Sequence, residues 1–515
     1  MMGLIVWGVI LRISQAVIQA APTILVGLLI AGIFRRLLGR DNTRRLFGHG
    51  TRRELPQAWL VGMLLPVCSL GVIPIAREMR RAGIAGGTVL AFAMTAPLFN
   101  PLSMLYGLTL SEPFVILAFA FCSMVVVTFV GGILNWLFPS VAVEEPPAPP
   151  VAYGLKRMTA IAVAAARELA GPSLGYIAIG LLGVALLAIV LEPTSLQMTM
   201  EHTNPYAPLS MVAVAIPAYA TPMVAMSQLG SMFQHANSIG AAFVLLALGA
   251  GINLGLIAWT FQNYGIRRGL GWMAILLSVI LALAYAVEDP LHPSAIDPPG
   301  HTHAFDIYCR PPFPSAAGLA QTVAAKIREN LQPFEMVGLI VLGSLSAVGF
   351  GLRAIDPRGR IESWLEKPPQ PSELGPEWLN MTLSPTVLGV VSLIGLIALS
   401  IVGCYAYYPS AKEVFAEMYI LRGEVLTAAT SGNKKHVEHQ VPLWDDWTRR
   451  LQVGVFLREG SVSPYRRMKA KVFRDRLEFL KHAVAEGDEE KTREYVSAVD
   501  RAYRRMRAAY LGPNS

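Results

Sequence analysis

Two stretches of the chain combine long apolar runs with helix-breaking residues. Leu65–Asn100 and Ile216–Asn253 are apolar enough to lie in a membrane, yet prolines and glycines interrupt both. Each ends in an apolar helix led by glycine, Gly87–Asn100 and Gly240–Asn253, which we expect to break at the asparagine. Because backbone groups in hydrocarbon must satisfy their own hydrogen bonds, broken segments persist there only around a protein-enclosed cavity. A matched pair in two halves of a chain indicates the binding site of a secondary transporter.

Longer apolar windows predict the membrane spans, because about 18 apolar residues cross a bilayer as a helix. Only 15% of the 515 residues are charged and 53% are hydrophobic, whereas soluble proteins carry about 25% charged residues. No signal-peptide cleavage pattern follows the first apolar stretch, so we expect it to be a retained span. The predicted class is an all-α integral membrane protein. The predicted spans are Ala16–Phe34, Ile84–Leu108, Pro113–Phe138, Leu174–Leu191, Ile239–Phe261, Leu270–Val287, Pro333–Leu352 and Thr386–Tyr407.

Positive charges predict the topology, since short cytoplasmic loops are rich in Lys and Arg. An arginine cluster from Arg35 to Arg53 places the end of the first span in the cytoplasm. Gln57–Ala76 is followed by further arginines, so a re-entrant hairpin keeps both basic sets on one side. Leu209–Met226 has no Lys or Arg in its flanks and is predicted to dip from the opposite side. The halves therefore form an inverted repeat, each with three spans and one broken hairpin.

This topology divides the chain into six parts and places the protein in the cell (inner) membrane as a multi-pass protein. Counting spans puts the charged C-terminal part outside, whereas its many Lys and Arg residues point to the cytoplasm. Because charge bias is unreliable for long domains, its side stays open. The parts are the first membrane repeat (1–138), a cytoplasmic linker (139–170), the second repeat (171–287), an extracytoplasmic loop (288–334), two additional spans (335–408) and a helical soluble C-terminal region (409–515).

The first broken segment carries a motif that resembles the predicted permease family that includes the organoarsenical (methylarsenite) efflux permeases. The matching residues are Pro66, Cys68, Ser69, Gly71 and Pro74, followed by Gly83, Gly87, Pro97 and Asn100. The resemblance extends from the N-terminus through both repeats. It implies export of small thiophilic solutes, typically trivalent methylated arsenicals, with cysteine thiols involved. Leu70 stands where the family's second cysteine is expected, and one thiol cannot chelate a soft ion as two or three can.

Candidate substrate-binding residues come from the broken segments of both halves. Each also has a simpler interpretation. Cys68 could be a small buried hydrophobe, like most free cysteines. The paired asparagines could bond neighbouring helices, and Thr221 could bond a carbonyl freed by Pro222. The candidates are Pro66, Cys68, Ser69, Gly71, Pro74, Pro97, Asn100, Tyr219, Thr221, Pro222, Gln228 and Asn253.

Missing residue types narrow the chemistry. No Asp or Glu lies inside the predicted spans of either repeat, so we expect a neutral substrate, an exchanger, or coupling through backbone and asparagine dipoles. No P-loop motif is present, which excludes that route of ATP hydrolysis. We find no nucleophile–base pair and expect neither an enzyme nor a cofactor. Two histidine clusters match no zinc template closely, and a metal site stays unknown. They are His301, His303, Asp306 and Cys309 in the loop, and His436 and His439 in the tail.

Two functions follow from these features. The first is a secondary permease that exports a small solute, thiophilic or metalloid in kind, through a cavity between the repeats. The alternative is a membrane-anchored adaptor or assembly factor that presents basic helices such as Tyr465–Arg474 to a partner or an anionic surface. Truncation at Tyr408 would separate them. The expected partners are the solute and the lipid bilayer, without nucleic acid, and a homo-oligomer stays open. The net charge of +8 is interpreted as a topology signal, because basic residues gather near the ends of spans, and not as a sign of nucleic-acid binding.

Overall fold

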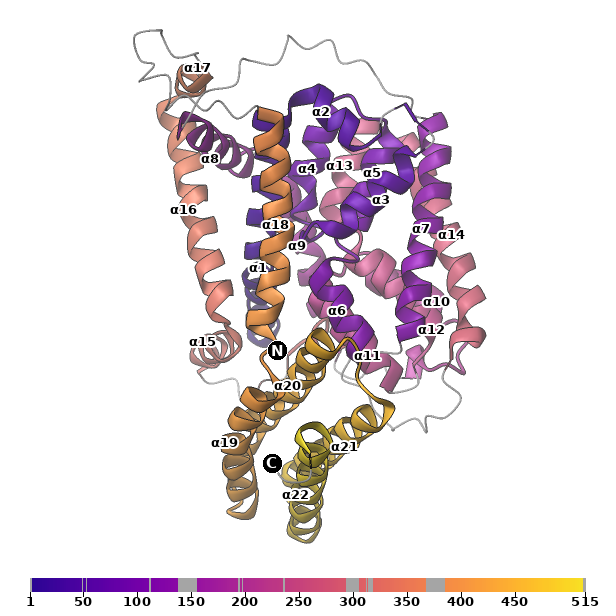
Figure 1. Cartoon of the computed structure of the whole chain (residues 1–515), viewed down its shortest axis with the longest axis vertical. Coiled ribbons are helices and arrows are strands. Elements are labelled where there is room, and N and C mark those ends of the chain that lie inside the picture. The colour runs from indigo at the N-terminus through magenta and orange to yellow at the C-terminus, as the bar shows by residue number, and fades with distance from the viewer. Residues whose placement is uncertain are drawn as a thin grey trace. The chain divides into compact units, whose positions relative to one another are not determined.

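The computed structural model is helical throughout its described part, as the sequence predicts, with one isolated β-bridge between Glu201 and Asn237. It describes residues 2–48, 50–51, 53–110, 113–137, 155–192, 195–196, 198–234, 237–292, 305–311, 313, 318–366 and 385–512. The chain forms two compact units (Figure 1). Unit 1 comprises Met1–Met104 and Phe114–Ala398, and unit 2 comprises Leu105–Pro113 and Leu399–Ser515.

The predicted repeat is visible in the order of the helices. In each half, a long helix is followed by two short helices, a broken helix and a second long helix. In the first half these are α1 (Met2–Ile33), α3 (Glu54–Leu64), α4 (Val72–Arg81), α5 (Gly86–Thr95), α6 (Pro101–Leu110) and α7 (Pro113–Leu137). In the second half they are α9 (Pro172–Val190), α10 (Ala207–Ala215), α11 (Pro222–Gln234), α12 (Ile239–Val244) with its π-helical extension η3 (Leu245–Ala250), α13 (Leu254–Tyr264) and α14 (Ile266–Leu291).

The remaining helices connect or extend this core. A π-helical turn, η1 (Phe34–Leu38), and α2 (Gly39–Leu46) continue α1, and a 3₁₀ turn, η2 (Met198–Met200), precedes α10. In the linker, α8 (Leu155–Leu169) packs against α1 and α16. After the second repeat follow α15 (Leu319–Asn330), α16 (Pro333–Ile355), α17 (Arg360–Glu366) and α18 (Pro385–Tyr407).

Six helices in the described residues are long and apolar enough to cross a membrane. They are α1 with its continuation, α7, α9, α14, α16 and α18, and the bent pair Ile239–Ala250 and Leu254–Tyr264 makes a seventh if it counts as one span. The helix predicted over Ile84–Leu108 is divided into α5 and α6, since the chain breaks between Thr95 and Pro101. Proline has no amide hydrogen to donate and is favoured in the first turn of a helix, and Pro101 begins α6.

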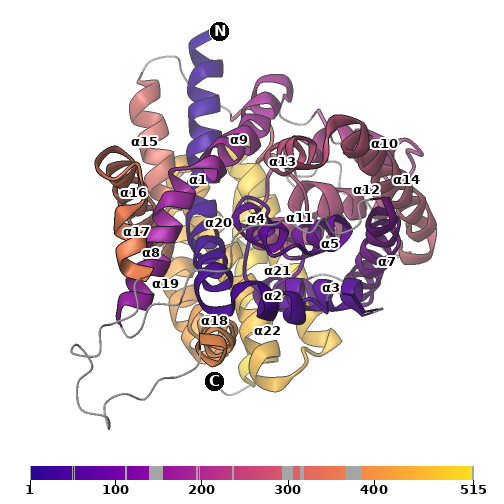
Figure 2. The same ribbon diagram turned by 90° about the horizontal axis from the view of Figure 1, so that it is seen from above.

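The broken segments of the two halves extend toward opposite ends of unit 1. Figure 1 shows α3 and α5 toward one end and α10 and α12 toward the other. Seen from above, the short helices α4, α5 and α11 lie between α1 and α9 on one side and α7 and α14 on the other (Figure 2). This arrangement is that of an inverted repeat whose broken segments are enclosed by long helices.

Glycine contacts repeat between the halves and explain how the hairpins reach the interior. A Cβ atom on Gly27 of α1 would lie 2.0 Å from the Gly71 carbonyl oxygen, and one on Gly183 of α9 would lie 2.1 Å from the Pro217 carbonyl oxygen. Each long helix therefore contacts the break of its own hairpin through a residue without a side chain. Only glycine permits two backbone segments to approach this closely, because it has no Cβ atom.

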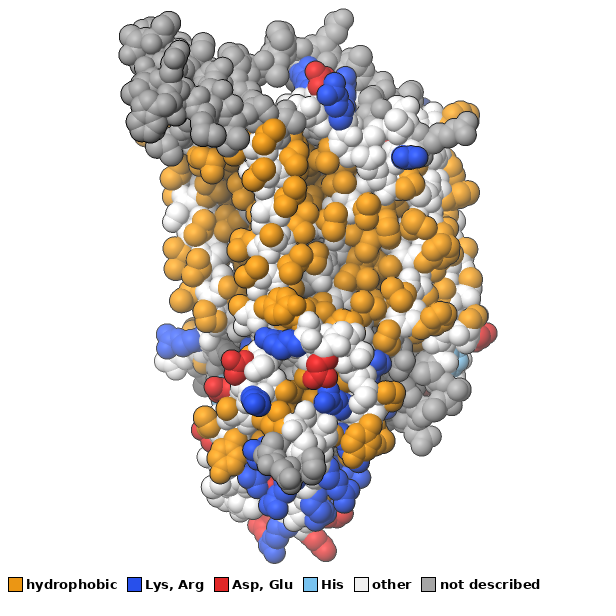
Figure 3. All heavy atoms as spheres, viewed as in Figure 1, with side chains coloured by type: hydrophobic (Ala, Val, Ile, Leu, Met, Phe, Trp, Pro, Cys, Tyr) orange, Lys and Arg blue, Asp and Glu red, His pale blue; other side chains and the backbone are white. Residues whose placement is uncertain are grey.

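The outer surface of unit 1 is apolar. Figure 3 shows a broad band of hydrophobic side chains over its helices. Phe121 of α7 is 61% exposed and Ile340 of α16 is also 61% exposed. Because soluble proteins rarely expose such continuous apolar surface, these faces are suited to lipid.

Unit 2 is a helical bundle with its own core, in agreement with the helical C-terminal region predicted. The helices that lie wholly within it are α19 (Ala411–Thr430), α20 (Lys434–Glu459), α21 (Pro464–Glu486) and α22 (Glu489–Leu511). Trp444, Phe473 and Tyr503 are buried and their rings contact one another.

A partly buried ion-pair group supports this bundle. Asp445 Oδ1 lies 2.5 Å from Arg474 Nε, and Asp445 Oδ2 lies 2.8 Å from Arg449 Nε. Burial alone would raise the pKa of Asp445, but the two arginines hold that pKa below its ordinary value. The stabilisation is therefore present above the unfolded pKa of about 3.9 and is lost as the pH falls through the folded pKa.

We expect Asp445→Asn to lower the free energy of unfolding at pH 7 by about 2 kcal/mol. This is less than for a fully buried pair, because the side chain is 24% exposed. Thermal unfolding of the purified protein measures the change. The control is Glu489→Gln in the exposed Glu489–Arg493 pair, which should cost less than about 0.5 kcal/mol. Equal melting temperatures for the two variants would contradict this assignment.

Candidate functional site

The breaks of the two hairpins meet inside unit 1. Cys68, from the break between α3 and α4, and Tyr219, from the break between α10 and α11, belong to one buried cluster. The Tyr219 hydroxyl lies beside the Cys68 and Thr23 side chains. The Cys68 sulfur also accepts a hydrogen bond from the Gly71 amide, with an N···S distance of 3.3 Å. Two segments far apart in the sequence, one from each repeat, thus share one buried position.

The breaks of the two bent helices also meet. A Cβ atom on Gly251, which follows η3, would lie 3.1 Å from Leu98 Cδ2 and 3.2 Å from the Met94 carbonyl oxygen. Gly180 of α9 joins the two meeting points, because a Cβ atom there would lie 2.6 Å from Leu70 Cδ2 and 3.0 Å from Asn253 Oδ1. All four interruptions of helical structure therefore converge within unit 1.

The two matched asparagines cap the second halves of the bent helices. Asn100 Oδ1 accepts a hydrogen bond from the Ser103 amide at 2.7 Å, and Asn253 Oδ1 accepts one from the Leu256 amide at 2.9 Å. Their side chains thus satisfy amides that the start of a helix leaves free. The predicted breaks at these positions are confirmed, and the bent pair at Asn253 turns by 62°.

Three candidate residues hold buried polar atoms without a hydrogen-bond partner among the described residues. These atoms are Ser69 Oγ, the Tyr219 hydroxyl oxygen and Asn253 Nδ2. Buried polar groups in native proteins are nearly always paired, and leaving one unpaired costs about 1–3 kcal/mol. The three atoms come from three of the converging breaks. They are available to a bound solute or to water.

The other candidates have mainly structural positions. Thr221 Oγ1 accepts a hydrogen bond from the Val224 amide at 3.4 Å at the start of α11. Gln228 Oε1 accepts a hydrogen bond from the Tyr308 hydroxyl at 2.9 Å. Pro74 is buried in α4, Pro97 is buried in the break before α6, Pro222 begins α11, and Pro66 and Gly71 lie in the break before α4.

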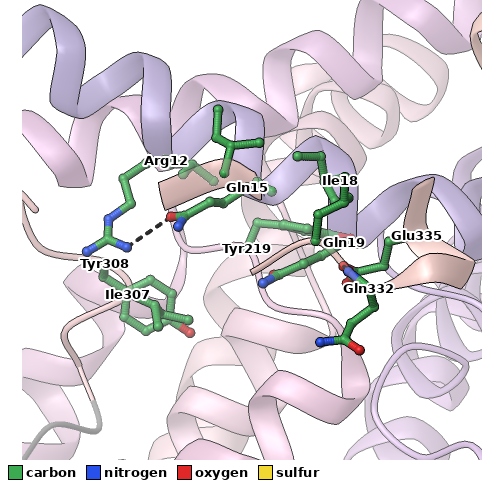
Figure 4. A pocket seen from close by; sticks show the side chains of 13 residues that line it. Arg12, Gln15, Ile18, Gln19, Tyr219, Ile307, Tyr308, Gln332 and Glu335 are labelled. Atoms are coloured by element: carbon green, nitrogen blue, oxygen red, sulfur yellow. Dashed lines mark hydrogen bonds between the residues drawn. The ribbon is translucent and has the colours of Figure 1, made fainter. Parts of the chain in front are cut away.

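A cavity of about 360 Å³ extends from Tyr219. Figure 4 shows Gln15 and Gln19 of α1 beside Tyr219, with Arg12 and Tyr308 on one side and Gln332 and Glu335 on the other. Of the predicted site residues, Tyr219 lines this cavity. Its lining also includes Ala16, Ile18, Val184, Ile307, Ile327 and Leu331.

Arg12 is fixed at the cavity by the segment before α15. Its Nε donates to the Cys309 carbonyl at 3.0 Å, one terminal nitrogen donates to the Asp306 carbonyl, and the other donates to Gln15 Oε1 at 3.1 Å. Asp306 and Cys309 therefore contribute backbone oxygens to Arg12. His301 and His303 of the same predicted cluster lie outside the described residues.

Sequence reasoning missed the polar wall of the cavity. The first span was predicted to begin at Ala16, whereas α1 begins at Met2 and includes Arg12 and Gln15. The spacing of Arg12, Gln15 and Gln19 is that of one helix face, which is a signal that the sequence contains. Gln332 and Glu335 form a capping box at the start of α16, and their position at the cavity has no local signal.

The amide of Asn253 can be tested separately from its capping role. We expect Asn253→Ala to lose both the cap and the Nδ2 donor, and to lower the free energy of unfolding by about 1 kcal/mol. Asn253→Ser should keep the cap and lose only the donor, so stability should be nearly unchanged while transport falls in both variants. Thermal unfolding combined with a vesicle transport assay distinguishes the two effects. Full transport by Asn253→Ser would show that the amide only caps the helix.

The fold and site define a multi-pass helical membrane protein of two inverted repeats with a buried polar centre. The chain belongs to the predicted permease family, whose model matches residues 8–288 and thus α1 through α14. α15–α18 and the four helices of unit 2 after Tyr408 follow the matched region.

Two curated proteins show similarity over a short region. One is the "UPF0718 protein YcgR" of Bacillus subtilis (strain 168), 32% identical over 85 residues, which are 16% of this chain and 29% of that protein. The other is the "Putative two-component membrane permease complex subunit" of Streptococcus mutans serotype c, 27% identical over 86 residues, 17% of this chain and 29% of that protein. The chain thus spans less than a third of the length of these relatives. No solved structure matches the chain.

Proposed function

We propose that the protein is a secondary permease that exports a small solute through the point where the broken segments meet. One observation carries the proposal: Ser69, Tyr219 and Asn253, from both repeats, converge with buried polar atoms that lack partners in the described chain. In transporters built from inverted repeats, substrate sites lie where discontinuous helices meet. Half-helix N-termini, such as that of α13 at Asn253, add partial positive charge there.

The side chains at this point favour a small neutral solute. Cys68, Ser69, Tyr219 and Asn253 supply one thiol, two hydroxyls and one amide, and all four are buried. Because no carboxylate is among them, a compact cation would find no countercharge. A thiol beside a hydroxyl suits a trivalent methylated arsenical, which can form one bond to sulfur and retain a hydroxyl. This solute class also agrees with membership of the predicted permease family.

The cavity forms the open side, and a set of polar contacts forms the closed side, of one state in an alternating-access cycle. The cavity leads from Tyr219 along the N-terminal half of α1, which the charge pattern places toward the outside. At the other end of α4, Arg77 Nε lies 2.6 Å from Glu168 Oε1, and an Arg80 terminal nitrogen donates to the Asn263 carbonyl at 3.0 Å. We infer that these contacts close the cytoplasmic side and must open to admit solute.

Transport into everted membrane vesicles tests the proposal. Vesicles that contain the wild-type protein should accumulate radiolabelled trivalent methylarsenite. We expect Cys68→Ser to lower the initial rate at least about tenfold, as expected for loss of a contact worth about 1.4 kcal/mol in the transition state. The matched control is Cys122→Ser, because Cys122 is a buried cysteine of α7 outside the cluster.

Equal transport rates for Cys68→Ser and Cys122→Ser would show that the Cys68 thiol does not bind the solute. If vesicles with the wild-type protein accumulate no thiophilic metalloid, such metalloids are excluded as the substrate class. The position of the site is tested independently by the Tyr219 variant discussed below.

An adaptor role for unit 2 is the second candidate, and α21 supports it. Tyr465, Met468, Val472 and Phe479 follow one helix face and are 57%, 46%, 41% and 42% exposed. Lys469 and Arg476 lie over the Tyr465 and Phe479 rings, which gives this face a basic border. A relative named as a permease complex subunit also suggests a partner protein.

Met468→Lys with Val472→Lys separates the two functions. If the protein is an adaptor, this variant should lose activity in cells, and vesicles of purified protein should show no transport with or without the substitutions, since only the cell supplies a partner. A permease that acts alone would be unaffected in both. The control is Arg493→Glu on α22, at an exposed side chain away from this face.

A further inference from the structure

His202, Glu288 and His292 come together at one end of unit 1, away from the converging breaks. His202 precedes α10, Glu288 lies in the last turn of α14, and His292 is the residue after that helix. His202 Nδ1 lies 2.7 Å from Glu288 Oε1. The two imidazole rings are stacked, with centroids 3.5 Å apart and planes 11° apart. One nitrogen from each ring and a carboxylate oxygen all lie within 4.8 Å of one another.

The Glu288 carboxylate is held in place by the start of α12. Oε2 accepts hydrogen bonds from Ser238 Oγ and from the Gly240 amide, both at 2.6 Å, and Oε1 accepts one from the Ile239 amide at 3.3 Å. Three donors on one carboxylate fix its orientation before any ligand binds. Outer contacts of this kind orient the ligands of metal sites.

His292 supplies a second and independent observation. Its Nδ1 is buried and has no hydrogen-bond partner within the described residues. A nitrogen in this position carries the cost of an unpaired polar group, about 1–3 kcal/mol, unless something binds it. This nitrogen is on the side chain that completes the group with His202 and Glu288.

We propose that His202, Glu288 and His292 bind a divalent first-row metal ion, with Zn²⁺ as the expected ion. Two imidazole nitrogens and one carboxylate oxygen are ligands that zinc accepts, at about 2.0–2.2 Å. The three ligand atoms must move closer together around the ion, which rotation of the two stacked imidazole rings allows. Water would occupy the fourth coordination position. Glu288 and His292 are four residues apart at a helix end, and the distant His202 completes the set.

The site ties parts of the second repeat together. A bound ion would join the segment before α10 to the end of α14 and, through Glu288, to the start of α12. At the start of α5 in the first repeat, the Asn135 side chain takes the place of the carboxylate and accepts from the Thr88 amide at 3.1 Å. The metal site is therefore specific to one half. It does not depend on the proposed transport function.

Zinc binding to the purified full-length protein tests the proposal. After chelator treatment, the wild-type protein in detergent should bind Zn²⁺, and its zinc absorption-edge spectrum should show two imidazole nitrogens. Saturating Zn²⁺ should also raise the melting temperature by about 5 °C, because an ion that binds only the folded state stabilises it. These effects should be lost in His202→Ala and His292→Ala, with affinity at least about 100-fold lower.

The control variant is His439→Ala, since His439 lies exposed on α20 in unit 2. His202→Ala is preferred to a Glu288 variant because Glu288 also holds the start of α12, and its loss could unfold the protein. Zinc binding and thermal stabilisation that persist in both His202→Ala and His292→Ala would overturn the proposal. Loss of both effects in these two variants, with retention in His439→Ala, would establish it.

Discussion

Gly183→Ala should disrupt the membrane core, although it adds a single methyl group. The new Cβ atom would lie 2.1 Å from the Pro217 carbonyl oxygen and 2.9 Å from the Pro217 carbonyl carbon. Real Cβ atoms do not approach backbone this closely, so α9 must move away from the break between α10 and α11. Overpacking of this kind costs about 1–3 kcal/mol, and we expect the upper end because backbone atoms cannot rotate away.

The displaced break carries Tyr219, and transport should therefore fall with stability. Melting temperature and vesicle transport measure the two effects. The matched control is Gly175→Ala on the same helix, where a Cβ atom meets nothing within 4 Å. That variant should be as stable as the wild type or up to about 1 kcal/mol more stable, since alanine favours a helix over glycine. Similar behaviour of Gly175→Ala and Gly183→Ala would contradict the close contact.

The equivalent change in the first repeat should have the same result. A Cβ atom on Gly27 would lie 2.0 Å from the Gly71 carbonyl oxygen, so Gly27→Ala should displace the break that carries Cys68. Loss of folding in both variants would support the internal symmetry of the repeats. A tolerated Gly27→Ala beside a damaging Gly183→Ala would show that the two contacts are not equivalent.

Tyr219→Phe should abolish most transport without lowering stability. The hydroxyl is buried beside the Cys68 and Thr23 side chains and makes no hydrogen bond of good geometry among the described residues, so its removal should leave stability unchanged or slightly higher while the ring stays in its cluster. If that hydroxyl binds solute, transport should fall at least about tenfold, which corresponds to about 1.4 kcal/mol. Loss of activity together with unchanged or higher melting temperature is difficult to obtain from a purely structural residue.

The control for this variant is Tyr503→Phe in the core of unit 2. Its hydroxyl is also buried and unpaired among described residues, so its stability should change in the same direction. Transport should stay at the wild-type level because this tyrosine belongs to the bundle core of unit 2. If Tyr219→Phe and Tyr503→Phe both transport normally, the converging breaks do not bind the solute.

Local patterns in the sequence predict much of this architecture. The asparagine breaks at Asn100 and Asn253 follow from matched sequence positions, and the structure confirms both as caps of the following half-helix. The hairpin breaks are indicated by the close spacing of prolines and glycines in apolar segments, whereas a single proline such as Pro22 is tolerated inside α1. The start of α1 was misplaced because a window of apolar residues excludes Arg12, although the cavity wall accommodates its charge.

The pattern of residues along the chain predicts the class of protein, the repeated order of spans and broken segments, and four of the side chains at the point where those segments meet. These properties depend on hydropathy and on residues whose conformational limits act over a few neighbours. Packing of distant helices places Cys68 beside Tyr219, brings Gln332 and Glu335 to the cavity of α1, and joins His202 to Glu288 and His292. Such pairings bring together segments from far apart in the chain. Helix packing determines these pairings, and no local pattern in a single sequence predicts them.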